Sequence, residues 1–297
     1  MTGKELKEFF ESRGVVLFDA AMGTALIAAG MPAGAHTEEM NLIAPETVLR
    51  IHIENIEAGS DVITGNTFGV SQMLFQGEKD KAIRALREGM SLAKRAASEG
   101  AREGKSILAC LDIGPTGKLL GPFGEAGYEE AEEVFAAQAE AGARSGADFV
   151  LLETFADSEE YLCAACAAVK ASALPVLGTM TFEESGRSFM GAAPADFVRA
   201  ARAEGVLAVG ANCTLEPAGM APVIKEILAA ADGLPVIAQP NAGQPVYKDG
   251  RISFEMTTDT FAAGAGKLLD LGISAIGGCC GTTPAMISAI RGIIDGR

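Results

Sequence analysis

The chain has 297 residues, of which 48% are hydrophobic and 21% charged, as in a globular protein with a well-filled core. It carries 39 acidic and 24 basic residues, so its formal net charge of −15 should repel nucleic-acid phosphates and anionic membranes. There is no tryptophan and there are only three tyrosines to stack on bases. We therefore expect no nucleic-acid partner and no membrane partner.

The first eleven residues are charged and polar, unlike a secretory signal peptide. The most apolar stretches, such as residues 271–281, are glycine-rich and shorter than the ~18 apolar residues of a membrane span. These features predict a cytoplasmic protein. In that reducing compartment the six cysteines are more often free, metal-bound or catalytic than paired in disulfides.

Short apolar runs alternate with longer amphipathic segments along the whole chain. The apolar runs predict buried parallel strands at residues 15–19, 61–66, 106–113, 149–154, 175–181, 208–214, 235–240 and 275–279. The amphipathic segments predict helices at residues 45–58, 79–99, 128–145, 158–171, 194–203, 217–231, 257–271 and 284–294.

Eight strand–helix units in series, with no polar linker between them, predict an α/β protein in which residues 1–297 form a single (β/α)8 TIM barrel. A doubly wound open sheet is the alternative. In a barrel the active site lies at the carboxyl ends of the strands. Small and polar residues gather at those ends here, which favours the barrel as the framework of a ligand site.

Cysteines stand at two of these strand ends. Cys213 closes the sixth predicted strand, and the pair Cys279-Cys280 closes the eighth. Three thiolates with one open position suit a reactive zinc ion, provided that the glycines around the adjacent pair let the backbone turn there. A vicinal redox pair, or buried cysteines without a role, are the alternatives from spacing alone.

The motif Gly277-Gly278-Cys279-Cys280-Gly281-Thr282, together with Gly210-Ala211-Asn212-Cys213, resembles the zinc motifs of homocysteine S-methyltransferases. Further motifs agree in order along the chain: Asp19-Ala20-Ala21-Met22-Gly23-Thr24, Asn66-Thr67-Phe68, Gly114-Pro115-Thr116-Gly117, Glu153-Thr154-Phe155 and Gln239-Pro240-Asn241-Ala242-Gly243. Within this family the chain looks most like the homocysteine-binding zinc module of cobalamin-dependent methionine synthases.

The resemblance implies an enzyme in which Cys213, Cys279 and Cys280 hold zinc and homocysteine binds as a zinc thiolate. It implies a methyl group delivered from methylcobalamin on a partner corrinoid protein or cobalamin domain, with methionine as product. S-methylmethionine or betaine is the alternative methyl donor. A non-catalytic zinc–thiolate protein or a vicinal-dithiol redox protein is the alternative of another class.

By the same resemblance, Asp19 and Glu153 hold the amino group of homocysteine, and backbone N–H groups near Ala20 and Ala21 take its carboxylate. The structural alternatives are a turn residue for Asp19 and a helix cap for Glu153. The family usually has glycine where this chain has Ala20, which puts the backbone contacts there in doubt.

Other candidate residues are expected to be structural. Asn212 and Asn241 are expected to order loops through bonds to the backbone. Cys163 and Cys166 are expected to pack within a helix, and Cys110 within the core. His36 and His52 are expected to lie at the surface or to be satisfied by hydrogen bonds.

Overall fold

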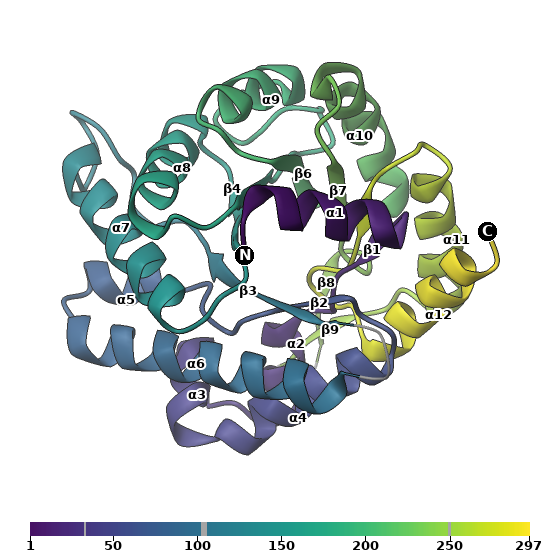
Figure 1. The fold of residues 1–297 in the computed structure, drawn as a ribbon, viewed down its shortest axis with the longest axis horizontal. Helices are drawn as coiled ribbons and strands as arrows, with labels where there is room; N and C mark the ends of the chain where they lie inside the picture. The colour runs from purple at the N-terminus through teal and green to yellow at the C-terminus, as the bar shows by residue number, and fades with distance from the viewer. Residues whose placement is uncertain (33, 102–105, 249–250) are drawn as a thin grey trace.

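A computed structural model describes residues 1–32, 34–101, 106–248 and 251–297. Eight parallel strands form one sheet in the order β1-β10-β7-β6-β5-β4-β3-β2, and helices surround it (Figure 1). The strands of this barrel are β1 (Val16–Leu17), β2 (Val62–Thr64), β3 (Leu108–Ile113), β4 (Val150–Phe155), β5 (Val176–Met180), β6 (Ala208–Asn212), β7 (Val236–Gln239) and β10 (Ala275–Ile276). The predicted (β/α)8 barrel is confirmed, and the open-sheet alternative is wrong.

All eight predicted helices are present, with ends that differ by a few residues. They are α4 (Pro45–Glu57), α6 (Lys79–Gly100), α7 (Tyr128–Arg144), α8 (Ser158–Ser172), α9 (Pro194–Ala203), α10 (Pro217–Ala231), α11 (Thr258–Leu269) and α12 (Pro284–Asp295). The sequence did not predict α1 (Gly3–Arg13), α2 (Met22–Ala28), η1 (Thr37–Glu39), α3 (Met40–Ile43) and α5 (Val70–Phe75). These additional helices are mostly short, and short helices have few turns over which a period can appear.

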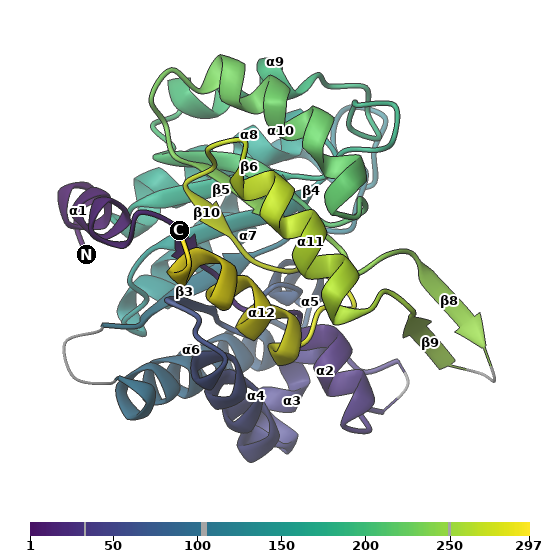
Figure 2. The same ribbon diagram turned by 90° about the vertical axis from the view of Figure 1, so that its right-hand side faces the viewer.

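A β-hairpin between β7 and α11 was also missed. Its strands, β8 (Pro245–Lys248) and β9 (Arg251–Phe254), pair antiparallel and project away from the barrel (Figure 2). At its base the Phe254 ring lies against Gly281, where an added Cβ would come within 2.2 Å of the ring. The hairpin is therefore seated on the turn that carries Cys279 and Cys280.

β1 and β2 meet at the seam where the barrel closes, largely through side chains. The Asp61 N–H donates to the Leu17 carbonyl at 2.7 Å, and the Asp61 carboxylate accepts from the Leu17 N–H at 2.9 Å. Higher along the seam, the Asp19 carboxylate accepts from the N–H and the hydroxyl of Thr64, both at 2.8 Å. Carboxylates thus replace part of the strand ladder where β1 and β2 are too short to form one.

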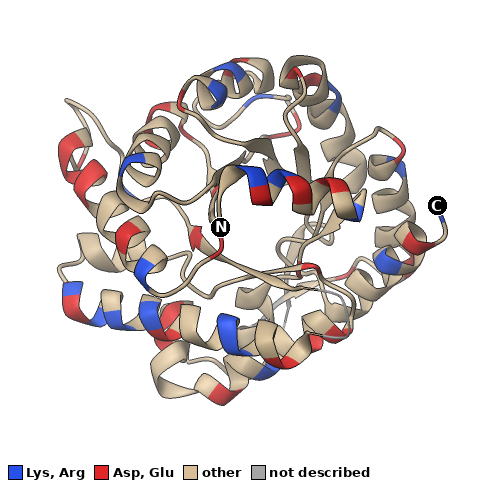
Figure 3. Cartoon of the chain, in the orientation of Figure 1, with Lys and Arg blue, Asp and Glu red and all other residues tan. Residues whose placement is uncertain are grey.

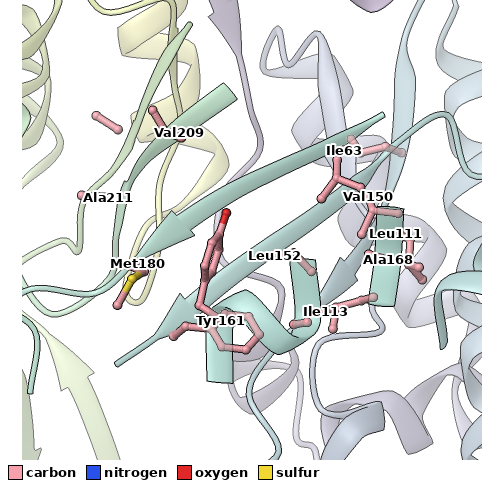
Figure 4. Close-up of a cluster of buried hydrophobic side chains, with 14 of the residues drawn as sticks. Ile63, Leu111, Ile113, Val150, Leu152, Tyr161, Ala168, Met180, Val209 and Ala211 are labelled. Carbon is pink, nitrogen blue, oxygen red and sulfur yellow. The ribbon is translucent and has the colours of Figure 1, made fainter. Parts of the chain in front are cut away.

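Side chains alternate between the inside and the outside of the barrel along each strand, as strand geometry requires. On β3, Leu108 and Cys110 pack inside with Phe149 and Leu151 of β4 and its preceding loop. The intervening residues face the helices. Figure 4 shows these outward side chains, including Ile63, Leu111, Val150 and Leu152. The next inward positions, at the carboxyl ends of β3 and β4, are therefore Asp112 and Glu153.

Helix α1 covers the amino-terminal end of the barrel (Figure 1). Its residues Leu6, Phe9 and Phe10 pack with the inward side chains of the strands. Thr2 and Glu5 begin the helix with reciprocal hydrogen bonds, which satisfies donors that a helix start otherwise leaves free. One end of the barrel is thus filled with apolar side chains, and a cavity lies at the opposite end.

Charged residues lie mainly on the surrounding helices (Figure 3). No helix within the described residues combines the length and the apolar character that crossing a membrane would require.

Candidate active site

A cavity of about 310 Å³ opens at the carboxyl ends of the barrel strands. The segments after β1, β2, β6 and β10 line it, together with the last residues of β3, β4 and β7. The cysteines Cys213, Cys279 and Cys280 line it, and so do the acidic residues Asp19 and Glu153. Every residue that the sequence singled out for the metal and the substrate therefore faces a single space.

The three cysteines converge although Cys213 lies 66 positions before Cys279. Their Sγ atoms all lie within 4.8 Å of one another, and those of Cys213 and Cys280 are 3.9 Å apart. Sulfurs bound to one tetrahedral zinc ion at about 2.3 Å would be about 3.8 Å apart. The donor set and its spacing therefore fit a zinc ion with small movements of the side chains.

Turns just beyond the strand ends produce this convergence. Cys213 and Thr214 adopt positive φ angles of 61° and 55°, so the chain reverses as soon as β6 ends. The N–H of Cys213 donates to the Gln239 carbonyl, and the N–H of Cys279 donates to the Pro240 carbonyl. Cys280 precedes Gly281, whose φ is 80°. Because the pair lies in this turn and not in β10, its two sulfurs can face the same point.

Hydrogen bonding among the three sulfurs shifts their pKa values in opposite directions. Hydrogen bonds from the thiols of Cys279 and Cys280 lower the pKa of Cys213, with a further contribution from the Asn241 side chain. The pKa of Cys279 is raised, because it donates to Cys213 and because it is buried. The cluster thus holds one thiolate easily and resists holding three unless a cation compensates them.

Asn212 connects this cluster to β4. Its fully buried side-chain oxygen accepts from the Thr154 N–H at 2.9 Å and from the Thr179 hydroxyl at 2.8 Å. Its amide group donates to the Thr154 hydroxyl at 2.7 Å and approaches the Cys279 sulfur at 3.9 Å. Thr154 has a φ of 65°, a strained value for a β-branched residue. Asn212 therefore holds the bend of the backbone at Thr154, and the residue before Thr154, Glu153, lines the cavity. The expectation that Asn212 orders the backbone is confirmed.

Asp19 and Glu153 are acidic groups in a buried setting. Burial raises the pKa of Asp19 to about 7, against the hydrogen bonds from Thr64 that lower it. Burial raises the pKa of Glu153 to about 8, helped by the negative charges of Cys213 and Asp19. Each carboxylate would therefore gain from a cationic partner, and no Lys, Arg or His lines the described part of the cavity.

The structural alternatives for these two residues are wrong. Asp157 caps α8 by accepting from the Glu159 N–H, so Glu153 does not serve as the cap. Asp19 bonds to Thr64, 45 positions away, and not within a local turn. Tertiary hydrogen bonds hold the Asp19 side chain at the cavity, and they hold the backbone next to Glu153.

Ala20 and Ala21 line the cavity, but their N–H groups already have partners. The Ala20 N–H donates to the Asn55 side chain at 2.9 Å, and the Ala21 N–H donates to the Thr282 hydroxyl at 3.1 Å. Neither N–H is free to bind a substrate carboxylate in this conformation. Ala20 precedes α2 and does not have a positive φ, so the methyl group that replaces the family's glycine is accommodated.

Sequence reasoning did not select Asp112 as a site residue, although it ends a predicted strand. The signal was the alternation of β3, which turns Leu108, Cys110 and Asp112 inward. Asp112 is 5% exposed and lines the cavity, and its Oδ1 atom has no hydrogen-bond partner.

The remaining expectations have mixed outcomes. Cys110 is buried in the core as expected, and Cys163 and Cys166 lie within α8. His36 is bonded to Gln76. The expectation for His52 is wrong, because it is fully buried on α4 and neither ring nitrogen has a partner. Asn241 does not show the expected bond to the backbone: its side-chain oxygen has no partner, and its side chain bonds to Cys213.

Residues 16–294 match the model of the family described as homocysteine S-methyltransferase. The chain belongs to the homocysteine S-methyltransferase family. It is 30% identical over 298 aligned residues to a methionine synthase of Mycobacterium tuberculosis, an alignment that covers 95% of this chain and 25% of that protein. A methionine synthase of Mycobacterium leprae is 29% identical over 294 residues, covering 94% of this chain and 24% of its own.

The chain thus spans about a quarter of the length of these curated relatives. Among solved structures, the metallated form of the homocysteine methyltransferase MmuM of Escherichia coli superposes with a TM-score of 0.77. It is 21% identical, and the match covers 97% of this chain and 99% of that one. This likeness supports the barrel fold of the family member described here.

Proposed function

We propose that residues 1–297 form a homocysteine-binding barrel domain of a zinc-dependent S-methyltransferase that converts homocysteine to methionine in the cytoplasm. The observation that carries the proposal is the convergence of the sulfurs of Cys213, Cys279 and Cys280 at the wall of an acidic cavity. These three residues would hold the metal ion. Zinc bound there would deprotonate an incoming thiol and leave it nucleophilic at neutral pH.

The carboxylates of Asp19 and Glu153 are proposed to bind the ammonium group of homocysteine. Both line the cavity that contains the sulfur cluster, and both are buried deeply enough that a cation would stabilise their ionised forms. Thr64 holds Asp19 in place, and Asn212 holds the backbone beside Glu153. The two acids would therefore orient the substrate without movement of their own strands.

Ala20 and Ala21 are proposed to lie beside the substrate carboxylate, at the start of α2. Their N–H groups are engaged by Asn55 and Thr282, so their contribution would be the shape of the turn. The absence of Lys, Arg and His from the described cavity wall favours recognition of this carboxylate by uncharged groups.

The methyl donor is proposed to be methylcobalamin carried by a corrinoid protein or cobalamin domain. Onium donors such as S-methylmethionine or betaine favour a cage of aromatic rings. Phe68 is the one aromatic residue on the described cavity wall, which disfavours such a cage. The similarity to methionine synthases that are about four times longer supports a donor on another domain or protein.

The metal proposal is tested by measuring zinc content and methyl transfer in Cys213→Ala, Cys279→Ala and Cys280→Ala. Each variant should lose most of its zinc and its activity, and Cys163→Ala, which alters a cysteine on α8, should retain both. Retention of zinc and near-normal transfer in a site variant would remove that cysteine from the proposal.

The substrate and donor proposals need separate measurements. Asp19→Asn and Glu153→Gln should raise the KM for homocysteine by about 10- to 100-fold, as expected for the loss of a charged hydrogen bond, while zinc stays bound. Turnover with S-methylmethionine and none with methylcobalamin would reverse the order of the donors. X-ray absorption at zinc that shows no added sulfur with homocysteine would favour a non-catalytic zinc protein or a redox protein.

A further inference from the structure

Asp112 differs from the other buried carboxylates of the described chain. The others that are at most 6% exposed each accept hydrogen bonds from the protein, whereas Glu153, which is partly exposed, accepts none. Asp19 accepts two from Thr64, Glu160 two from Thr116, Glu38 bonds from Gly69 and Thr37, and Asp61 bonds from Leu17 and Arg291. The Oδ1 atom of Asp112 is buried without any partner. This exception calls for a reason, because a buried acceptor without a donor costs about 1–3 kcal/mol, and more when it is charged.

No Lys, Arg or His on the described cavity wall compensates Asp112. The side-chain oxygen of Gln239, on the same cavity wall, also has no partner. Rotation of that amide group can exchange its oxygen for its NH2 group, whereas an ionised carboxylate has only acceptors in any orientation. Burial raises the pKa of Asp112 well above its usual value, and the charges of Glu153, Glu38 and Asp19 act in the same direction. The partner that Asp112 lacks would therefore be a donor of hydrogen bonds, preferably a cation, that comes from outside the chain.

The position of Asp112 limits what that donor can be. The side chain points inward near the end of β3, whose neighbours are β4, which carries Glu153, and β2, whose Thr64 holds Asp19; all three acids line the same cavity. An α-ammonium group has three N–H donors. Three carboxylates line this cavity, and its described wall holds no Lys, Arg or His. Their number equals the number of ammonium N–H donors, and their negative charge is opposite to that of the ammonium group.

We infer that Asp112 is a third acceptor for the ammonium group of the substrate and that it helps to select α-amino thiols over thiols without an amine. The inference rests on the proposed function, in which Asp19 and Glu153 bind the same group. Its physical basis is that the unliganded protein leaves a carboxylate unpaired, and the bound ammonium group supplies the missing donor. Selectivity follows because a thiol without an amine would enter the cavity and leave all three acids uncompensated.

The experiment compares three thiols with the zinc-loaded protein by calorimetry: homocysteine, 3-mercaptopropylamine, which lacks the carboxylate, and 4-mercaptobutanoate, which lacks the ammonium group. In Asp112→Asn, the affinity for homocysteine and for 3-mercaptopropylamine should each fall by about 10- to 100-fold. The affinity for 4-mercaptobutanoate should not fall. Asp157→Asn, which alters a partly exposed cap for which asparagine is equally suited, should leave all three affinities unchanged.

A second measurement separates binding from folding. Asp112→Asn should raise or leave unchanged the melting temperature of the unliganded protein, because it removes a buried carboxyl group whose Oδ1 atom has no partner. Asp61→Asn, at a buried carboxylate with several partners, should lower it. A large loss of stability in Asp112→Asn would show that the carboxylate has a structural role and would overturn the inference.

The binding results also separate this inference from the proposed function. If the unaltered protein binds homocysteine and Asp112→Asn binds it equally well, the inference about Asp112 is wrong and the proposed function stands. If the loss follows the carboxylate, so that 4-mercaptobutanoate is weakened and 3-mercaptopropylamine is not, Asp112 contacts the other end of the substrate and the inference is also wrong. If the unaltered protein binds none of the thiols, the proposed function fails, and the role of Asp112 with it.

Discussion

Replacement of Asn212 by alanine should weaken the protein in two measurable ways. The substitution removes three hydrogen bonds of 2.7–2.9 Å from a fully buried side chain. At about 1 kcal/mol each, their loss should lower the free energy of unfolding by about 3 kcal/mol. With an unfolding entropy of about 2.1 cal/mol/K per residue, a chain of this length should melt about 5 °C lower.

The same substitution should affect the substrate more than the metal. Without Asn212, the strained backbone of Thr154 can relax, and the neighbouring Glu153 carboxylate leaves its position in the cavity. The KM for homocysteine should then rise by about 10-fold, as expected when a charged contact is lengthened. Zinc content should stay near normal, because the bond from the Cys213 N–H to the Gln239 carbonyl does not involve Asn212.

The assay combines thermal unfolding, zinc analysis and steady-state kinetics. Gln138→Ala is the matched control, because Gln138 is also fully buried and bonded, to Ser71 and Val134, but does not line the cavity. The control should melt at a lower temperature and keep its KM. An Asn212→Ala protein with a lowered melting temperature and an unchanged KM would refute the idea that Asn212 positions Glu153.

Three further predictions concern stability. Burial lowers the pKa of His52 to about 4 from an unfolded value near 6.5, so the unfolded chain binds the additional proton. The free energy of unfolding should therefore fall by about 3 kcal/mol in total as the pH drops from about 6.5 to about 4. His52→Leu should remove this part of the pH dependence of urea unfolding, and an unchanged pH dependence would exclude His52 as its source. Tyr161→Phe should stabilise the protein by about 1 kcal/mol, because the buried Tyr161 hydroxyl has no partner, and a loss of stability in the calorimeter would reveal a hydrogen bond that the structure lacks. Ala173→Gly should raise the free energy of unfolding by about 0.5–1 kcal/mol, because Ala173 ends α8 in the left-handed conformation with a φ of 55°. A lower melting temperature would contradict this prediction. Zinc content should not change.

The sequence was sufficient to predict the elements that repeat with a clear period. Eight apolar runs separated by amphipathic segments predicted the barrel, and the barrel predicted which end of each strand carries the site. The hairpin of β8 and β9 was missed because it interrupts this rhythm with two strands of four residues each. Its position is fixed by contact with Gly281, which lies far along the chain.

Local sequence also identified Cys213, Cys279 and Cys280 as a possible metal set, because cysteines next to glycines at strand ends are chemically conspicuous. It could not show that their sulfurs approach within 4.8 Å. That distance depends on the turn at Cys213. It also depends on the hydrogen bonds that the N–H groups of Cys213 and Cys279 donate to the end of β7, which lies between β6 and β10. Asn212 was placed correctly as an ordering residue, but its link to Thr154 crosses 58 positions.

What the sequence determined by itself was the order of the strands and helices and the chemistry available at the strand ends, since both follow from short-range periodicity and residue type. What the tertiary structure decided was which of these groups share one space and which lack a partner there. The N–H groups of Ala20 and Ala21 were expected to be free and are bonded, and Asp112 was passed over and has an unpaired oxygen. Whether a polar group has a partner depends on strands brought together by closure of the barrel, and no local pattern encodes that.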